Sequence, residues 1–253
     1  MLTVTELKYT YPNQSSIFED FSWHVNQGEG WAVLGPSGCG KTTLLYLLAG
    51  LRKPDAGGIL IRGEALQRPR PSTGLILQDY GLLPWATVRE NARLGLEVRS
   101  FYGPDGTHSP LTQPDLKGVD AWLDRLGIQD VADKYPAQIS GGQRQRTAIA
   151  RTLSLEPDLL LMDEPFSSLD MVTRADLQHL TWELCRESGI TMIIVTHSVD
   201  EAAALGRKIL VLHRPPNQKA VVIDNPAPTG LTTSQPCPEA SLLERLQQAM
   251  ESA

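Results

Sequence analysis

The octapeptide at residues 35–42 constrains the possible fold and function of this chain more than any other stretch. It reads Gly-Pro-Ser-Gly-Cys-Gly-Lys-Thr, follows the apolar run 31–34 and leads into the helix-like stretch 43–49. A glycine loop between a strand and a helix can point its backbone N–H groups, and those of the first helical turn, at a phosphate chain. We therefore predict a nucleotide-phosphate site formed by Gly35, Pro36, Ser37, Gly38, Cys39, Gly40, Lys41 and Thr42.

Single residues of the octapeptide suit separate tasks. Gly38 and Gly40 permit backbone conformations and close approaches that a Cβ would block. Lys41 offers a mobile positive charge to the β- and γ-phosphates, and the Thr42 hydroxyl is a ligand for Mg²⁺. The alternative is a tight glycine-rich turn with a solvated lysine, which the flanking strand and helix disfavour.

The length, net charge and cysteine content of the chain narrow the class of protein. With 253 residues and a net charge of −6, it can bury a substantial core but has no overall basic field to recruit nucleic acid. The 3 cysteines form neither a zinc spacing nor a disulfide framework, which indicates a reducing compartment. We find no signal peptide, and no apolar run approaches the ~20 residues that span a bilayer. Any function at a membrane would therefore require a partner protein.

Strand-like and helix-like segments alternate along the chain, which predicts an α/β fold with a parallel sheet covered on both faces. The apolar runs 159–162 and 191–195 are typical of strands buried on both sides. Helical spacing marks residues 87–96, where Thr87 and Glu90 form a capping box, and residues 171–187. Residues 101–117 are loop-like, and the stretch 225–238 predicts a linker to a short terminal helix.

Three polar sites follow predicted strands, at the edge where ligands of parallel sheets bind. They are the phosphate loop, the pair Asp163 and Glu164, and His197. Adjacent residues of an extended chain point to opposite sides, so we assign Asp163 to Mg²⁺ and Glu164 to polarising an attacking water. The alternatives are two acids in an exposed loop and a histidine satisfied within the core. Convergence of the three sites favours one ATP site.

The pentapeptide Ile139-Ser-Gly-Gly-Gln143 resembles the signature of ATP-binding cassette (ABC) ATPases. The phosphate loop, Gln78, the Asp163–Glu164 pair, the stretch 168–170 and His197 complete the family's motifs in order, and the resemblance covers roughly residues 1–225. It implies the ABC form of the P-loop NTPase fold: a mainly parallel core sheet, an N-terminal antiparallel β subdomain and a helical signature subdomain at about 80–155. Residues 226–253 would form a Pro-rich linker and a short C-terminal helix.

The resemblance also implies site roles. Tyr11 would stack on adenine, with Tyr9 as a competitor, and Thr43 would approach the α-phosphate. Gln78 would couple metal and water to a partner subunit, and His197 would hold the γ-phosphate. The signature residues would face the γ-phosphate of a second copy in a head-to-tail dimer, and Asp170 would link the two sites. The signature residues are Ser140, Gly141, Gly142 and Gln143.

Cys39 occupies a variable position of the family's phosphate loop. If that loop is accessible, alkylation of the Cys39 thiol should block ATP binding.

Residues 78–91 resemble importer ATPases for nitrate, sulfonate, taurine and related solutes. The Leu-Pro-Trp segment 83–85 would meet an integral-membrane permease, and a solute-binding protein would choose the cargo. The resemblance thus implies a Mg²⁺-dependent ATPase that is peripheral to the cytoplasmic face of the cell membrane. Two alternatives remain: a soluble ABC ATPase acting on ribosomes or nucleic acid, and a non-catalytic nucleotide-binding regulator. The acidic balance opposes the first, and the presence of Lys41, Glu164 and His197 opposes the second.

Overall fold

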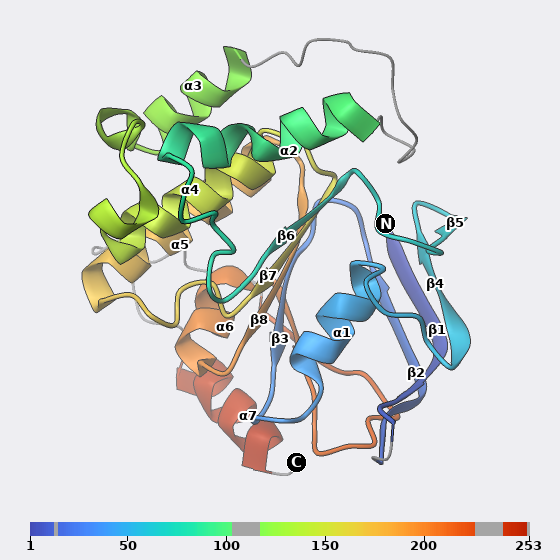
Figure 1. Cartoon of the computed structure of the whole chain (residues 1–253). Coiled ribbons are helices and arrows are strands. Elements are labelled where there is room, and N and C mark those ends of the chain that lie inside the picture. Colours follow the sequence, from blue (N-terminus) through green and yellow to red (C-terminus); the bar gives the residue numbers. More distant parts are fainter. Residues whose placement is uncertain (13–14, 103–116, 226–239, 252–253) are drawn as a thin grey trace.

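The strands form two sheets in a computed structural model that describes residues 1–12, 15–102, 117–225 and 240–251 (Figure 1). The larger sheet has the order β10-β9-β3-β8-β7-β6 and the smaller one the order β2-β1-β4-β5. The larger sheet contains β3 (Gly30–Leu34), β6 (Thr73–Ile76), β7 (Leu159–Asp163), β8 (Thr191–Thr196), β9 (Lys208–Val211) and β10 (Val221–Asp224). The smaller sheet contains β1 (Leu2–Thr10), β2 (Ser16–Val25), β4 (Ala56–Ile61) and β5 (Glu64–Ala65).

The helices form two groups around the larger sheet (Figure 1). Helix α1 lies between the two sheets, whereas α2, α3 and α4 lie together on the other side, away from α1. The helices are α1 (Lys41–Leu48), α2 (Val88–Tyr102), α3 (Lys117–Arg125), α4 (Gly141–Leu153), α5 (Met171–Glu187), α6 (Val199–Leu205) and α7 (Ala240–Glu251), with short 3-10 turns at Gln129–Val131 and Pro136–Gln138.

Parallel pairing brings the predicted site residues to one edge of the larger sheet. Strands β6, β7, β8, β3 and β9 are parallel, and only β10 runs antiparallel, against β9. The register pairs Asp163 with Val195 and Leu34 with Thr196, so the segments that follow β3, β7 and β8 leave the sheet side by side. The sequence-based expectation of convergence at this edge is confirmed.

The alternation of side chains along β7 builds two cores. Leu159 and Leu161 are fully buried on the side of α1, and Leu160 and Met162 are fully buried on the side of the other helices. A strand covered on both faces needs apolar residues at every position, which accounts for the uninterrupted apolar run. Burial of one such side chain stabilises the fold by about 1.5–3 kcal/mol.

Local signals place the starts of α2 and α5 close to where the sequence predicts them, whereas α2 continues to Tyr102, beyond its predicted end at residue 96 and into the predicted loop 101–117. The capping box at α2 is present: Thr87 N donates to Glu90 Oε2 at 2.7 Å, and Glu90 N donates to Thr87 Oγ1 at 3.2 Å. Helix α5 has the predicted limits and begins after Asp170, whose Oδ1 accepts from Thr173 N at 3.1 Å. The predicted loop 101–117 and linker 225–238 lie mostly outside the described residues.

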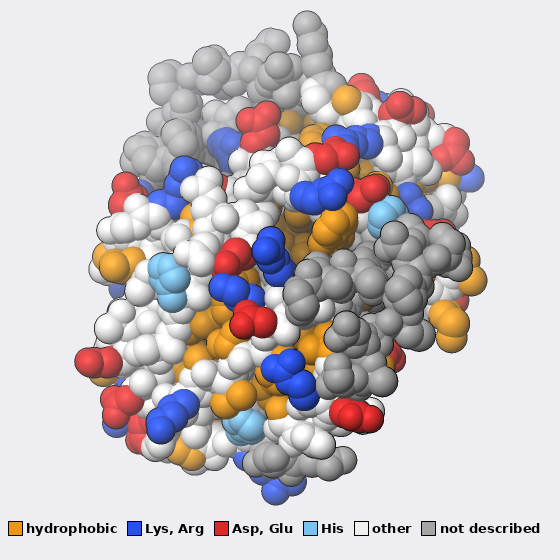
Figure 2. All heavy atoms as spheres, turned by 180° about the vertical axis from the view of Figure 1, so that it is seen from behind, with side chains coloured by type: hydrophobic (Ala, Val, Ile, Leu, Met, Phe, Trp, Pro, Cys, Tyr) orange, Lys and Arg blue, Asp and Glu red, His pale blue; other side chains and the backbone are white. Residues whose placement is uncertain are grey.

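The C-terminal helix α7 packs against α6 and β9, with Leu242 and Leu246 buried in the same core as the helical layer. Within the described residues, no helix is long and apolar enough to cross a bilayer. Seen from behind, the molecule shows Lys and Arg side chains interspersed with Asp and Glu, so that no single-sign field covers this face (Figure 2).

Candidate nucleotide site

The phosphate loop adopts a conformation that needs glycine. Gly38 and Gly40 have φ angles of 79° and 105°, and a Cβ on Gly40 would lie 2.5 Å from Ile17 Cγ2. Helix α1 begins directly after Gly40, and among the described residues no side chain caps it. The amides of its first turn therefore stay available to an anion.

A cavity of about 300 Å³ opens over this loop. Lys41 lies at its wall and is 7% exposed; its Nζ donates to Gly35 O at 2.8 Å and Pro36 O at 3.0 Å. These two carbonyls hold the ammonium next to the loop amides, where it can meet phosphate oxygens. The cavity is lined by Tyr11, Ile17, Ser37, Gly38, Gly40, Lys41, Thr42, Thr43 and Glu164.

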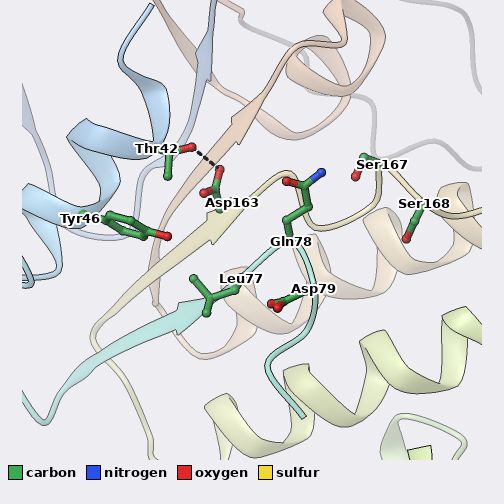
Figure 3. Close-up of a pocket in the computed structure, with 8 residues that line it drawn as sticks. All are labelled: Thr42, Tyr46, Leu77, Gln78, Asp79, Asp163, Ser167 and Ser168. Atoms are coloured by element: carbon green, nitrogen blue, oxygen red, sulfur yellow. Dashed lines mark hydrogen bonds between the residues drawn. The ribbon is translucent and has the colours of Figure 1, made fainter. Parts of the chain in front are cut away.

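A second cavity, of about 590 Å³, shares Thr42 with the first (Figure 3). Gln78 and Asp163 extend into it from the ends of the neighbouring strands β6 and β7. The Thr42 hydroxyl donates to Asp163 Oδ1 at 3.2 Å. The lining residues are Thr42, Tyr46, Leu77, Gln78, Asp79, Asp163, Ser167 and Ser168.

The donors of this second cavity fit Mg²⁺. Hydroxyl, carboxylate and amide oxygens are its preferred ligands, and Mg²⁺ is held by one or two carboxylates together with substrate phosphates. Burial raises the pKa of Asp163, and the hydrogen bond from Thr42 offsets part of that rise. A cation beside Asp163 would favour its charged form. Among the described residues no three His, Cys, Asp or Glu side chains cluster as metal ligands, so phosphate oxygens would have to complete the set.

Glu164 occupies a strained position at the wall of the phosphate cavity. Its φ is 44°, and its backbone N–H donates to Val195 O at 2.9 Å. A non-glycine residue in this region costs about 1–3 kcal/mol and persists where the surroundings fix it, often at functional sites. His197 Nδ1 lies 3.0 Å from Glu164 Oε2, so the two side chains that the sequence assigned to water and γ-phosphate form a direct pair.

Of the two tyrosines considered for the base, only Tyr11 lines the phosphate cavity. Its hydroxyl lies 3.2 Å from Thr43 Oγ1, and Arg52 approaches the Tyr11 ring at 4.9 Å. Tyr9 is buried beneath it, edge-on to the Tyr11 ring at 5.1 Å. The geometry therefore favours Tyr11 as the residue that a base can reach.

The signature residues do not line either cavity of the same chain. They begin α4, where Ser140 and Gln143 form a reciprocal capping box: Gln143 N donates to Ser140 Oγ at 3.2 Å, and Ser140 N donates to Gln143 Oε1 at 3.0 Å. Asp170 is likewise absent from both linings and caps α5. Both groups are presented at helix N-termini, where anions bind favourably.

The Cys39 thiol does not meet the condition set for alkylation. Its side chain is 1% exposed, and burial raises the pKa of the thiol. The Cys39 side chain packs in the apolar core on the α1 side of the larger sheet, and Cys39 is not among the residues that line the phosphate cavity.

Some residues of the site were missed by sequence reasoning. Tyr46 lines the larger cavity from α1, four residues after Thr42, and this helical spacing could have revealed it. No comparable sequence pattern indicates that Ile17 and Ser167 line the cavities.

Asn217, in the loop between β9 and β10, is a further missed residue and is 3% exposed. Its Nδ2 donates to Cys39 O at 2.9 Å and to Ile17 O at 3.3 Å, and its Oδ1 accepts from His213 N at 2.8 Å. Asn217 thus joins the phosphate loop to β2, whose Ile17 also lines the phosphate cavity.

A model of the family described as ABC transporter matches residues 18–167, more than half of the chain. The chain belongs to this family. Within it, the motif set and fold are those of the ABC ATPase cassettes, as the sequence predicted.

Two curated relatives are named as import ATP-binding proteins. The taurine import ATP-binding protein TauB of Pseudomonas aeruginosa is 42% identical over 201 residues, which cover 79% of this chain and 73% of that protein. The nitrate import ATP-binding protein NrtC of Synechococcus elongatus is 41% identical over 198 residues, 78% of this chain. The match spans only 29% of that longer relative.

Solved structures confirm the fold of the cassette. One is cbiO1 from Clostridium perfringens, which is described as part of an ABC transporter complex. It has a TM-score of 0.75 and 30% identity, and the match covers 89% of this chain and 88% of that chain. The dimeric structure of MJ0796, a bacterial ABC transporter cassette, has a TM-score of 0.75 and 26% identity, with 88% and 98% covered.

Proposed function

We propose that this cassette binds and hydrolyses ATP to energise a membrane importer of a small solute such as nitrate, sulfonate or taurine. One observation carries the proposal: the phosphate loop, Asp163 and Glu164 meet at two cavities that share Thr42. The relatives that are named as import ATP-binding proteins support the direction of transport and the solute class.

The residues have separable tasks in hydrolysis. The loop amides and Lys41 bind the phosphates, and Tyr11 contacts the base. Glu164 orients a water and accepts its proton as the water oxygen attacks the γ-phosphorus and the bond to the β-phosphate oxygen breaks. His197 holds Glu164 in position and contacts the γ-phosphate. Such chemistry depends mostly on positioning and electrostatic stabilisation.

Mg²⁺ would be held by Thr42 and Asp163, with Gln78 beside them. When bound, it would neutralise charge on the phosphates and supply electrostatic stabilisation of the transferred group.

A second copy would complete the site. Ser140, Gly141, Gly142 and Gln143 line neither cavity of their own chain, and a head-to-tail dimer would bring them to the γ-phosphate of the other chain. Asp170 would lie between the two sites. The dimeric cassette among the similar structures supports this arrangement.

The permease would dock at the segment 82–86. Trp85 is 74% exposed there, and exposed large aromatic side chains are typical anchors of interfaces. Docking on an integral-membrane permease would place the chain at the cytoplasmic face of the membrane. A solute-binding protein would select the cargo outside this chain.

A pull-down tests the proposal. Tagged Glu164→Gln protein with ATP, which should accumulate the ATP-bound dimer, is incubated with detergent-solubilised membranes. We expect an integral-membrane permease to be recovered, whereas ribosomes or DNA without a membrane protein would support the soluble alternative. The net charge of −6 and the intermixed charges in Figure 2 weigh against that alternative.

A second variant locates the docking surface. Trp85→Ala should lose the permease but keep ATP hydrolysis. Leu51→Ala is the matched control, because Leu51 is an exposed apolar residue outside the segment 82–86, with 54% of its surface accessible. Equal recovery of the permease by the Trp85 variant and the control would contradict the docking assignment.

A further inference from the structure

The Tyr80 side chain connects two loops that follow neighbouring strands. Tyr80 comes two residues after Gln78, and its ring is 9% exposed. Its hydroxyl lies 2.6 Å from Ser168 Oγ, toward the short end of the range for O–H···O hydrogen bonds. Ser168 lines the cavity of Asp163 and precedes Asp170 by two residues. One hydrogen bond therefore joins the turn after β6 to the loop after β7.

The signature helix holds the same turn from its other side. Arg151 of α4 donates from Nη2 to Tyr80 O at 2.7 Å and from Nη1 to Gly81 O at 2.6 Å. Near the start of α4, the Arg144 guanidinium lies 5.9 Å from the centre of the Tyr80 ring. Tyr80 thus contacts both the helix that begins with the signature and the loop that leads to Asp170.

The backbone of this turn is unusual for its residue type. Tyr80 has a φ of 65°, followed by 58° at Gly81. A bulky residue with positive φ is a conformational outlier, and such outliers persist where the surroundings over-determine them. Here the contacts with Ser168, Arg144 and Arg151 hold Tyr80 in this conformation. The position of the turn therefore depends both on the loop after β7 and on α4.

The turn continues directly into the segment 82–86, in which Pro84 and Trp85 are exposed and Ala86 is buried. Three hydrogen bonds join this segment to α2: Asn91 Oδ1 accepts from Leu83 N at 2.8 Å, and Asn91 Nδ2 donates to Leu83 O at 3.1 Å and Ala86 O at 3.0 Å. Asn91 thus restrains the segment on the α2 side, and Ser168 and Arg151 restrain Tyr80 in the turn that leads into it.

We propose that Tyr80 is a positioning residue whose hydrogen bond to Ser168 couples the nucleotide cavity to the segment 82–86. The inference deepens the proposed function, because it rests on ATP binding at that cavity. When bound ATP fixes the loop that contains Ser168, it also fixes the segment 82–86 through Tyr80. By thermodynamic reciprocity, a partner bound to this segment changes the affinity for ATP by the same factor.

Hydrogen exchange of the isolated chain tests the coupling. In the Glu164→Gln background, exchange of the amides in segment 82–86 is measured with and without ATP, at ATP concentrations that saturate each variant. We expect ATP to slow exchange in the parent protein. Tyr80→Phe keeps the ring and removes only the hydroxyl, and it should weaken the ATP-induced protection about fivefold, the change expected for one net hydrogen bond.

Two further variants separate coupling from structural damage. Ser168→Ala should reduce the protection by the same factor, and the double variant should show no additional loss, because the two changes remove one interaction. Tyr135→Phe, an exposed tyrosine of the helical layer, is the matched control and should behave as the parent. Exchange without ATP reports any general loosening of the fold.

The outcomes distinguish the two proposals. A parent chain that fails to bind ATP overturns the proposed function. The parent could instead bind ATP and show the protection while Tyr80→Phe behaves as the parent, or while the losses in the double variant are fully additive. Either result would overturn the role of Tyr80 and leave the proposed function standing.

Discussion

His197 Nδ1 lies 3.0 Å from Glu164 Oε2, although 33 residues separate them in sequence. The two side chains follow neighbouring parallel strands, β8 and β7, so the sheet itself sets their separation. Glu164 is the partly buried member of the pair, with 20% of its side chain exposed, and His197 is 61% exposed. The histidine thus holds the carboxylate from the solvent side, and it lines neither of the two cavities at the phosphate loop.

Replacement of either member of this pair should lower turnover more than nucleotide affinity. We expect Glu164→Gln to reduce kcat by about 10²–10⁴-fold, the usual contribution of a general base. His197→Ala should reduce kcat by about 10- to 100-fold, which corresponds to the loss of one charge-assisted hydrogen bond. The measurements are phosphate release for kcat and equilibrium ATP binding for affinity.

The matched control for the histidine is His24→Ala, since His24 lies on β2 and bonds to Thr3 and Asn26 in the smaller sheet. It should keep the parent kcat. A Glu164→Gln protein that hydrolyses ATP at the parent rate would show that another group orients the water.

Asn217 should affect ATP binding more than catalysis. In Asn217→Asp the side chain keeps its shape, but a carboxylate cannot donate to Cys39 O or Ile17 O. It also adds a negative charge near the phosphate cavity. We expect the KM for ATP to rise about tenfold or more, equivalent to the ~1–3 kcal/mol of an unsatisfied buried group, with a smaller change in kcat.

Asn225 provides a control of the same chemistry away from the phosphate loop. It is 2% exposed, and its Nδ2 donates to Ala203 O at 2.7 Å and Gly206 O at 2.8 Å. Asn225→Asp should lower the thermal midpoint like the Asn217 variant but leave the KM for ATP unchanged. If both variants raise the KM equally, general destabilisation accounts for the effect.

The sequence predicted the sheet and the convergence of its loops because buried parallel strands have a strong local signal. The runs at 159–162 and 191–195 are apolar at every position, and helix starts such as those at Thr87 and Asp170 carry capping residues. These features depend on neighbours within a few residues. Local pattern was therefore enough to place Asp163, Glu164 and His197 at one edge.

The long-range side-chain contacts could not be predicted in the same way. Tyr80 and Ser168 are 88 residues apart, and Asn217 bonds to Cys39 and Ile17 across 178 and 200 residues. Their partners are set by how loops fold over the ends of the sheet, which no periodicity encodes. The burial of Cys39 is a similar case, since a position in a glycine loop suggests exposure but the loop turns this side chain inward.

Cys39 should resist alkylation in the folded protein. Its thiol is 1% exposed, and burial raises its pKa, so the reactive thiolate is both scarce and shielded. We expect peptide mapping after brief treatment with a maleimide to find Cys39 unmodified in buffer and modified in urea. Cys185 is an internal reference, because burial raises the pKa of its thiol to about 12. Rapid labelling of Cys39 alone in buffer would show that the loop opens.

Glu29, before β3, should make stability depend on pH. Burial raises its pKa, but hydrogen bonds from Asn26, Lys208 and Trp31 outweigh that effect and lower the pKa from 4.5 to about 2. A carboxyl with a lowered pKa in the folded state stabilises the fold above its unfolded pKa, and this stabilisation is lost as the pH falls from 4.5 toward 2.

The size of this effect is measurable by urea unfolding of the parent and Glu29→Gln proteins. A shift of this size corresponds to about 2–3 kcal/mol at pH 7 after allowance for solvent screening. The difference in unfolding free energy between the two proteins should fall by about half at pH 3, because the unfolded carboxyl is then protonated while the folded one is still mostly ionised. Glu64→Gln, at an exposed position of β5, is the control and should differ little from the parent at either pH. A Glu29→Gln difference that is the same at pH 7 and pH 3 would mean that packing around Glu29, and not its charge, stabilises this end of the sheet.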